Sequence, residues 1–156
     1  MSIGIIGGKG RMGQCLVSAL TQRGYNPIIG VRENILHPTS NITSNLKQLV
    51  DNSQTIILSV KPQDIPNVCQ NISPLLNKPA NKLIISIAAG IPREWYFRWF
   101  EEKYYESHFM RIMPSYFLDQ GLSIIGIDCT RQAFDKHRHM LDNMFNPNYI
   151  YHCYTI

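Results

Sequence analysis

The sequence predicts an α/β fold of the doubly wound class, in which helices cover both faces of a mostly parallel sheet. Apolar runs of strand length alternate with helical patterns along the 156 residues. Two of these runs, Thr55–Val60 and Leu83–Ala88, are too apolar to face water on either side, which is typical of strands in a parallel sheet. The chain has no internal repeat, low-complexity tract or linker, so residues 1–156 are expected to form one domain.

Short apolar runs predict seven strands and apolar residues at helical spacing predict five helices. The strands are expected at 3–6, 27–31, 55–60, 83–88, 109–113, 122–127 and 149–154. The helices are expected at 12–20, 46–50, 65–76, 95–100 and 131–145. Right-handed crossovers between parallel strands place the following loops along one edge of the sheet, where ligands bind in folds of this class.

The first half of the chain carries clear signals for its elements. The strand Ile3–Ile6 is followed by a helix whose residues Met12, Leu16 and Leu20 share one face, and Gly24 ends that helix. The stretch between Arg32 and Asn45 is too short for a full helix. It also contains a proline, so Glu33–Thr39 is expected to be a loop or a single turn.

In the second half, two segments are candidates for contact with a partner or a second copy. The helical segment Trp95–Phe100 is so aromatic that its rings fall on two adjacent stripes, and some of them should be exposed. A wide core face is the simpler interpretation of this segment. The closing strand Tyr149–Tyr154 is expected at an edge of the sheet, where strands can pair with another chain.

A glycine-rich stretch follows the first strand and opens the first helix. Gly-Lys-Gly-Arg-Met-Gly matches the pattern Gly-x-Gly-x-x-Gly inside a strand–helix–strand unit of about 30 residues. In this pattern the first glycine permits a tight turn, the second lets a pyrophosphate approach the main chain, and the third lets the helix pack on the strand. The amino end of the helix then offers N–H groups to the phosphates. A flexible turn without a ligand is the alternative, but the context favours a Rossmann-type dinucleotide site made by Gly8, Lys9, Gly10, Arg11, Met12 and Gly13.

The end of the second strand bears on the choice between NAD and NADP. NAD sites usually place an acidic side chain there to accept a hydrogen bond from the ribose 2′-hydroxyl, whereas NADP sites use arginine to meet the 2′-phosphate. Here the strand ends in Arg32, with Glu33 directly after it. The sequence therefore favours NADP(H) over NAD(H), although Arg32 could instead be a solvated surface residue and Glu33 could reach a ribose hydroxyl.

Three further stretches carry a family resemblance. They are SVKPQD (59–64), LIISIAAGIP (83–92) and MRIMPS (110–115). Together with the glycine loop, and in this order, they resemble the coenzyme-binding domain of pyrroline-5-carboxylate reductase, and the resemblance covers nearly the whole chain. That family reduces a cyclic imine to L-proline by hydride transfer from NADPH or NADH. Prephenate dehydrogenase and F420-dependent NADP reductase have related glycine loops and are more distant candidates, which do not explain SVKPQD or ISIAAGIP.

The resemblance implies further coenzyme-binding residues. Three groups of them follow predicted strands, and an asparagine precedes a predicted helix. The coenzyme would cross the sheet edge at Val60, Lys61 and Pro62, and its nicotinamide would lie against Ala88, Ala89 and Gly90 and beside Met113 and Pro114, with Asn45 near the adenosine. Ala88–Gly90 can also be a tight turn after a strand, and the two roles are compatible. No catalytic residue is assigned.

The sequence also departs from that family. The family continues with a helical domain that supplies most of the imine pocket, and this chain is expected to represent the coenzyme-binding domain only. The family pattern Met-Pro-Asn-Thr-Pro is Met-Pro-Ser-Tyr-Phe here, at 113–117, and Lys9 and Arg11 replace smaller residues in the glycine loop. Two hypotheses follow: an imine-reducing enzyme whose site is completed by further chain or by a partner, and a stand-alone NAD(P)-binding module without reductase activity.

Charge, cysteine and histidine patterns give no support for nucleic-acid binding, metal binding or a redox dithiol. A net charge of +4 without a dense basic run gives no reason to expect a nucleic-acid partner. The four cysteines are scattered and contain no Cys-x-x-Cys pair, so buried reduced thiols are expected rather than a zinc or dithiol site. His137 and His139 should face different sides of a helix and form no metal pair, and the other histidines appear isolated in the sequence. Apolar runs are too short to cross a bilayer and no signal segment opens the chain, so we expect a cytoplasmic protein without metal.

Overall fold

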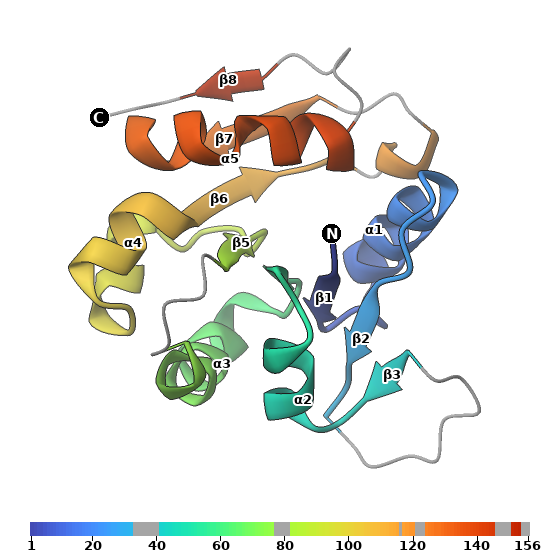
Figure 1. Ribbon diagram of the computed structural model, residues 1–156, viewed down its shortest axis with the longest axis horizontal. Coiled ribbons are helices and arrows are strands. Elements are labelled where there is room, and N and C mark those ends of the chain that lie inside the picture. The colour runs from blue at the N-terminus through green and yellow to red at the C-terminus, as the bar shows by residue number, and fades with distance from the viewer. Residues whose placement is uncertain (33–40, 77–81, 116, 121–123, 146–150, 154–156) are drawn as a thin grey trace.

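Eight described strands form one sheet in the order β3-β2-β1-β4-β5-β6-β7-β8 (Figure 1). The structure is a computed structural model that describes residues 1–32, 41–76, 82–115, 117–120, 124–145 and 151–153. The strands are β1 (Ile3–Ile6), β2 (Ile28–Gly30), β3 (Ile42–Thr43), β4 (Thr55–Leu58), β5 (Leu83–Ser86), β6 (Phe109–Met113), β7 (Ile125–Asp128) and β8 (Tyr151–Cys153). Every pairing is parallel except that of β6 with β7. The predicted mostly parallel sheet is confirmed.

Helices cover both faces of this sheet. The α-helices are α1 (Arg11–Gln22), α2 (Leu46–Asp51), α3 (Ile65–Ile72), α4 (Glu102–His108) and α5 (Arg131–Met144). Short 3₁₀ helices lie at η1 (Pro62–Asp64), η2 (Ser73–Leu75), η3 (Arg93–Arg98) and η4 (Leu118–Gln120). None of these helices is both long and apolar enough to span a bilayer.

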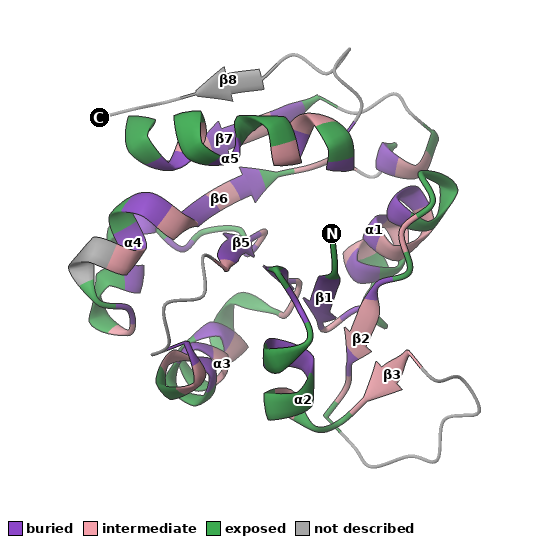
Figure 2. Ribbon diagram, viewed as in Figure 1, coloured by how far each residue is buried: buried purple, intermediate pink, exposed green. Residues whose placement is uncertain are grey.

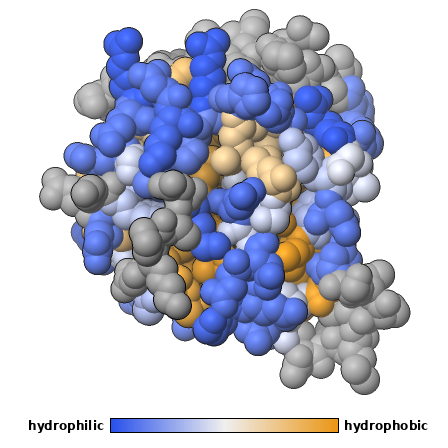
Figure 3. Space-filling view, in the orientation of Figure 1, coloured by the Kyte–Doolittle hydropathy of each residue, from blue (hydrophilic) through white to orange (hydrophobic). Residues whose placement is uncertain are grey.

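The core consists of two apolar layers, one on each face of the sheet. Alternate strand residues point to opposite faces, so Ile5 and Ile57 pack with α1 and α5, whereas Ile56 and Ile84 pack with α2, α3 and α4. Both sets are fully buried, and the central strands are accordingly purple in Figure 2. On the face shown in Figure 3, hydrophilic side chains prevail and hydrophobic ones show only in small areas between them.

Some predicted bounds need correction. The predicted helix 65–76 is α3 up to Ile72 and then the 3₁₀ helix η2, whose first turn contains Pro74. The aromatic segment 95–100 is also 3₁₀, at Arg93–Arg98, rather than a regular α-helix. Of the strand expected at 122–127, residues 122 and 123 lie outside the described residues, and the described strand is β7, Ile125–Asp128. The loop expected at Glu33–Thr39 lies outside the described residues.

Two elements were not predicted. Strand β3 has only two residues, and helix α4 has no clean apolar stripe in its sequence. Packing of buried Tyr105 on Phe109, with ring centroids 5.1 Å apart, anchors α4 to the next strand. The predicted exposure of some aromatic rings is confirmed at Trp95 and Phe97, while Tyr96 and Phe100 are buried. Strand β8 pairs with β7 alone and forms the predicted edge of the sheet.

The predicted buried thiols are confirmed for Cys69 and Cys129, while Cys15 is half-buried. Burial raises the pKa of the Cys69 thiol to about 12, so this group is an unreactive part of the core. The side chain of Cys153 lies outside the described residues. Within the described ranges, no group of three or more His, Cys, Asp or Glu side chains is arranged to hold a metal ion.

Helices α4 and α5 meet through two histidines, which corrects the expectation that His108 is isolated. Their rings lie 5.5 Å apart, and His137 is buried while His139 is exposed, as predicted. Lys136 Nζ donates to His108 Nε2 at 2.8 Å, so the proton of the neutral ring sits on Nδ1 and is donated to Ser107 Oγ at 2.6 Å. His137 donates from Nε2 to the Ser107 carbonyl at 3.0 Å. Acceptance of the Lys136 hydrogen bond at Nε2 therefore holds the His108 ring neutral.

Acid should weaken this helix contact. Burial, helped by Lys136 and His137, lowers the pKa of His108 to about 4, and burial also lowers the pKa of His137. An unfolded histidine titrates near pH 6.5, so the unfolded chain binds more protons below that pH and stability falls between about pH 6.5 and pH 4. We expect His108→Asn to reduce this fall in the thermal midpoint by roughly 3 °C. His139→Asn is the control, and identical pH profiles for His108→Asn and the unmodified chain would contradict the account.

Candidate functional site

The turn between β1 and α1 brings bare main chain to the carboxyl edge of the sheet. Gly7 has a φ of +84°, a conformation that side chains disfavour, and its N–H donates to Gly30 O at 3.1 Å. Gly10 N then donates to Gly7 O at 3.0 Å, and Gly10 is the N-cap residue of α1, directly before its first residue Arg11. Because Gly10 has no side chain to cap the helix, the first N–H groups of α1 are available to a ligand.

The glycines of the motif have different roles. A Cβ on Gly13 would lie 2.4 Å from Gly7 O, and one on Gly8 would lie 2.9 Å from the Ile29 side chain. These two glycines therefore allow close packing. The turn is made by Gly7 rather than by Gly8, which corrects the role predicted for the first glycine of the motif. A Cβ on Gly10 would meet Gly7 O at 3.3 Å and Ser59 O at 3.9 Å.

A cavity of about 750 Å³ opens beside this turn. It lies at the exit of β1, which has β2 on one side in the sheet and β4 on the other. This is the switch point, at which open α/β sheets bind ligands. Its walls come from the glycine turn, the ends of β2 and β3, the start of α2, and the segment from the end of β4 into α3. The described lining residues are Ile6, Gly7, Lys9, Gly10, Gly30, Val31, Arg32, Thr43, Ser44, Asn45, Leu46, Leu49, Ser59, Val60, Lys61, Gln63, Asp64, Asn67, Val68 and Asn71.

Six of the predicted site residues line this cavity together. They are Lys9, Gly10, Arg32, Asn45, Val60 and Lys61. Gly8 and Gly13 support the turn from behind, Met12 packs against the core and Arg11 is exposed on α1. Pro62 begins the 3₁₀ helix η1, as its missing N–H predicts. The adenosine and phosphate side of the predicted site is thus assembled from distant segments of sequence.

The residues predicted at the nicotinamide end lie apart from this cavity. Ala88 is buried in the core, and Gly90 has a φ of +73° in the turn after β5. Gly90 and Met113 line a second cavity of about 620 Å³, whereas Ala89 and Pro114 line neither of the two. In the second cavity Asp128 Oδ1 lies 3.1 Å from Arg93 Nε, and Asp128 Oδ2 lies 3.6 Å from Arg111 Nη1.

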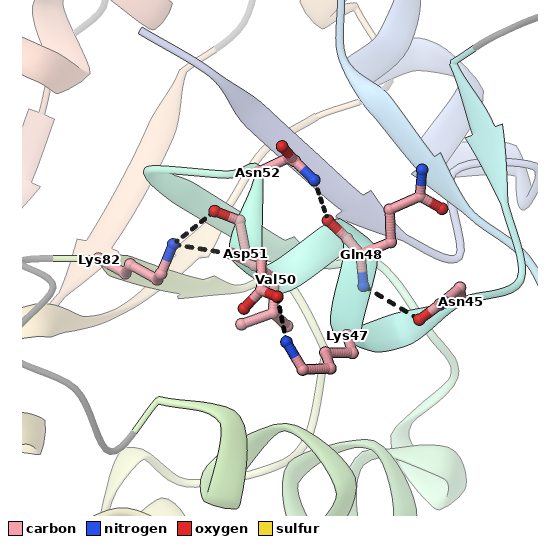
Figure 4. A network of polar contacts seen from close by, with 7 residues as sticks. All are labelled: Asn45, Lys47, Gln48, Val50, Asp51, Asn52 and Lys82. Carbon is pink, nitrogen blue, oxygen red and sulfur yellow. Dashed lines mark hydrogen bonds and ion pairs between the residues drawn. The ribbon is translucent and has the colours of Figure 1, made fainter.

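Asn45 has a structural role beside its place in the cavity wall. Its side chain caps α2 by accepting a hydrogen bond from Gln48 N at 3.0 Å (Figure 4). At the other end of α2, Lys82 Nζ donates to the carbonyls of Val50 and Ser53, each at 2.7 Å. The short helix is therefore held at both ends, which fixes the cavity wall that it forms.

Sequence reasoning missed several polar groups in the cavity. Ser59 directly follows β4, and its hydroxyl is buried with no hydrogen-bond partner among the described residues. Asp64 directly before α3, and Asn67 and Asn71 within it, follow at helical spacing, which is the one signal that could have pointed to them. Asp64 forms an ion pair with Arg32, whose side chain is 75% exposed against 27% for Asp64.

These observations fit a dinucleotide. The bare main chain at Gly10 leaves room for a pyrophosphate, and Lys9 and Lys61 supply positive charge near it. The unpaired Ser59 hydroxyl can bond a phosphate or ribose oxygen. Arg32 and Asn45 also line the wall of this cavity.

A mostly parallel sheet with a glycine turn and a cavity at its switch point is the arrangement of a Rossmann-like fold. The family model described as NADP oxidoreductase, coenzyme F420-dependent, matches residues 2–90. This match covers more than half of the chain, and the chain belongs to that family.

Comparison with individual proteins confirms the resemblance predicted from the sequence. A pyrroline-5-carboxylate reductase of Pasteurella multocida is 33% identical over 102 residues, which are 58% of this chain and 36% of that protein. The structure of pyrroline carboxylate reductase from Plasmodium falciparum with NADP bound superposes with a TM-score of 0.81 at 20% identity, over 99% of this chain and 58% of that one. The structure of an imine reductase variant from Myxococcus stipitatus in complex with NAD+ has a TM-score of 0.69 at 18% identity, over 97% of this chain and 54% of that one. The chain spans about a third of the length of the first curated relative.

Proposed function

We propose that residues 1–156 form one coenzyme-binding domain that holds NADP(H), in preference to NAD(H), for the reduction of a cyclic imine of the pyrroline-5-carboxylate type. The single observation that carries the proposal is the cavity at the exit of β1, where a glycine turn, three cations and an unpaired hydroxyl meet. The bound coenzyme would supply the hydride. The pyrroline-5-carboxylate reductases similar to this chain support the choice of reaction.

In this proposal each part of the chain has a distinct task. The amino end of α1 and Gly10 hold the pyrophosphate, with Lys9 and Lys61 adding positive charge. Arg32 meets the adenosine 2′-phosphate, for which a guanidinium offers paired donors. The turn Ala88–Gly90 and the neighbouring Met113–Pro114 segment bind the nicotinamide and place it near the second cavity. No side chain of this chain is assigned to proton transfer.

A second candidate function is an NAD(P)-binding module without reductase activity. It is favoured by one feature of the geometry, because the residues assigned to the nicotinamide end do not line the cavity that six of the other site residues line. An imine pocket must be shaped and closed to water beside the nicotinamide for efficient hydride transfer.

Two measurements on the purified chain test these functions. We expect NADPH to bind, as followed by fluorescence titration, and we expect only background oxidation of NADPH when pyrroline-5-carboxylate is added. Turnover well above background would mean that this chain alone completes the imine pocket, which would reject the binding-module function. Failure of both NADPH and NADH to bind would reject both functions.

A further inference from the structure

Arg32, the residue proposed to bind the 2′-phosphate, already has an anionic partner. Its guanidinium is ion-paired with Asp64. Arg32 follows β2 and Asp64 ends η1, just after β4, and these two strands flank β1 on opposite sides. The ion pair therefore reaches across the exit of β1, beside the glycine turn.

The charges around the cavity make Asp64 distinctive. Lys9, Arg32 and Lys61 contribute three positive charges to the wall. Among the described lining residues, Asp64 supplies the one carboxylate. Its side chain is mostly buried, whereas that of Arg32 is mostly exposed. Asp64 is consequently the less movable member of the pair, and Arg32 is the member that can turn toward a ligand.

We propose that Asp64 limits the selectivity for NADP(H) over NAD(H) by competing with the 2′-phosphate for Arg32. This inference rests on the proposed coenzyme function. A 2′-phosphate must draw the Arg32 guanidinium away from Asp64 or share the guanidinium with it. In either case the phosphate lies next to the Asp64 carboxylate, which repels the phosphate. A 2′-hydroxyl meets no such opposition, because it can donate to the Asp64 carboxylate while Arg32 stays paired. Asp64 thus weakens NADPH binding and narrows the preference that Arg32 creates.

The test compares the dissociation constants of NADPH and NADH for the unmodified chain, Asp64→Asn, Asp64→Ser, Arg32→Ala and the double variant Arg32→Ala/Asp64→Asn. We expect both Asp64 substitutions to tighten NADPH binding about fivefold, the effect of one exposed ion pair, and to leave NADH binding unchanged or weaker. Arg32→Ala should weaken NADPH far more than NADH. In the background of Arg32→Ala, Asp64→Asn should have a smaller effect on NADPH, because the competition is already gone.

Asp135→Asn is the matched control, since it removes the same charge from an ion pair with Arg131 on α5, away from the cavity. It should leave both dissociation constants unchanged. If Asp64→Asn and Asp64→Ser bind both coenzymes as the unmodified chain does, or change both alike, the selectivity role of Asp64 is wrong while the proposed function stands. If neither coenzyme binds the unmodified chain, the proposed function fails and this inference fails with it.

Discussion

Gly10→Val should bind NADPH at least roughly a hundredfold more weakly than the unmodified chain while remaining folded. Gly10 has φ and ψ of −67° and 165°, an extended conformation that valine readily adopts. Its Cβ would meet Gly7 O at 3.3 Å and Ser59 O at 3.9 Å, so the turn has to give by only a few tenths of an ångström. The added methyl groups would instead occupy the cavity wall where the pyrophosphate must approach. Losing one or two charge-assisted hydrogen bonds there accounts for about a hundredfold in affinity.

Isothermal titration with NADPH and a thermal melt of the same sample separate binding from folding in this variant. Thr21→Val serves as the control, because Thr21 is exposed near the far end of α1. It should bind NADPH as the unmodified chain does. Retained affinity in folded Gly10→Val would mean that the pyrophosphate does not pass this part of the turn.

Gly13→Ala should destabilise the fold itself, by about 3 kcal/mol or more, and lower the thermal midpoint by roughly 10 °C. The added Cβ would lie 2.4 Å from Gly7 O and 2.7 Å from Gly8 Cα. Both are main-chain atoms of the turn, so no side chain can rotate away to make room. Helix α1 would have to move off β1, and the buried contacts of Leu16 and Leu20 with the sheet would be lost in part.

Gly126→Ala gives the comparison for this destabilisation. A Cβ on Gly126 would meet Met113 Cβ at 3.8 Å, an ordinary contact distance, and the residue lies within strand β7. The chemical denaturation midpoint of Gly126→Ala should therefore stay close to that of the unmodified chain. If Gly13→Ala is equally well tolerated, then α1 does not pack on the turn as closely as described.

The fold was predictable where local sequence and burial agree. Strands β4 and β5 are buried on both faces, and a continuous apolar run is the direct consequence of that environment. Helix α4 was not predictable in this way. Its stability comes from contacts between Tyr105 and residues distant from its own turn, including Phe97, with ring centroids 3.8 Å apart. Such aromatic packing leaves no regular period in the sequence.

The candidate site was predictable in its centre and less so at its edges. The glycine motif and Arg32 could be assigned because each follows a strand whose end faces the same edge. The pairing of Arg32 with Asp64 could not, since it depends on β2 and β4 lying on either side of β1. The turn role of Gly7 was also missed, because two glycines in succession leave the position of the positive φ open in sequence alone.

The proposed function depends above all on binding of the nicotinamide dinucleotide in the cavity at the exit of β1. Amide chemical-shift mapping of the ¹⁵N-labelled chain during addition of NADPH tests it most directly. We predict that shifts concentrate at Gly7, Gly10, Arg32 and Val60, around the cavity. An unchanged spectrum, or shifts confined to the second cavity around Asp128, would contradict it.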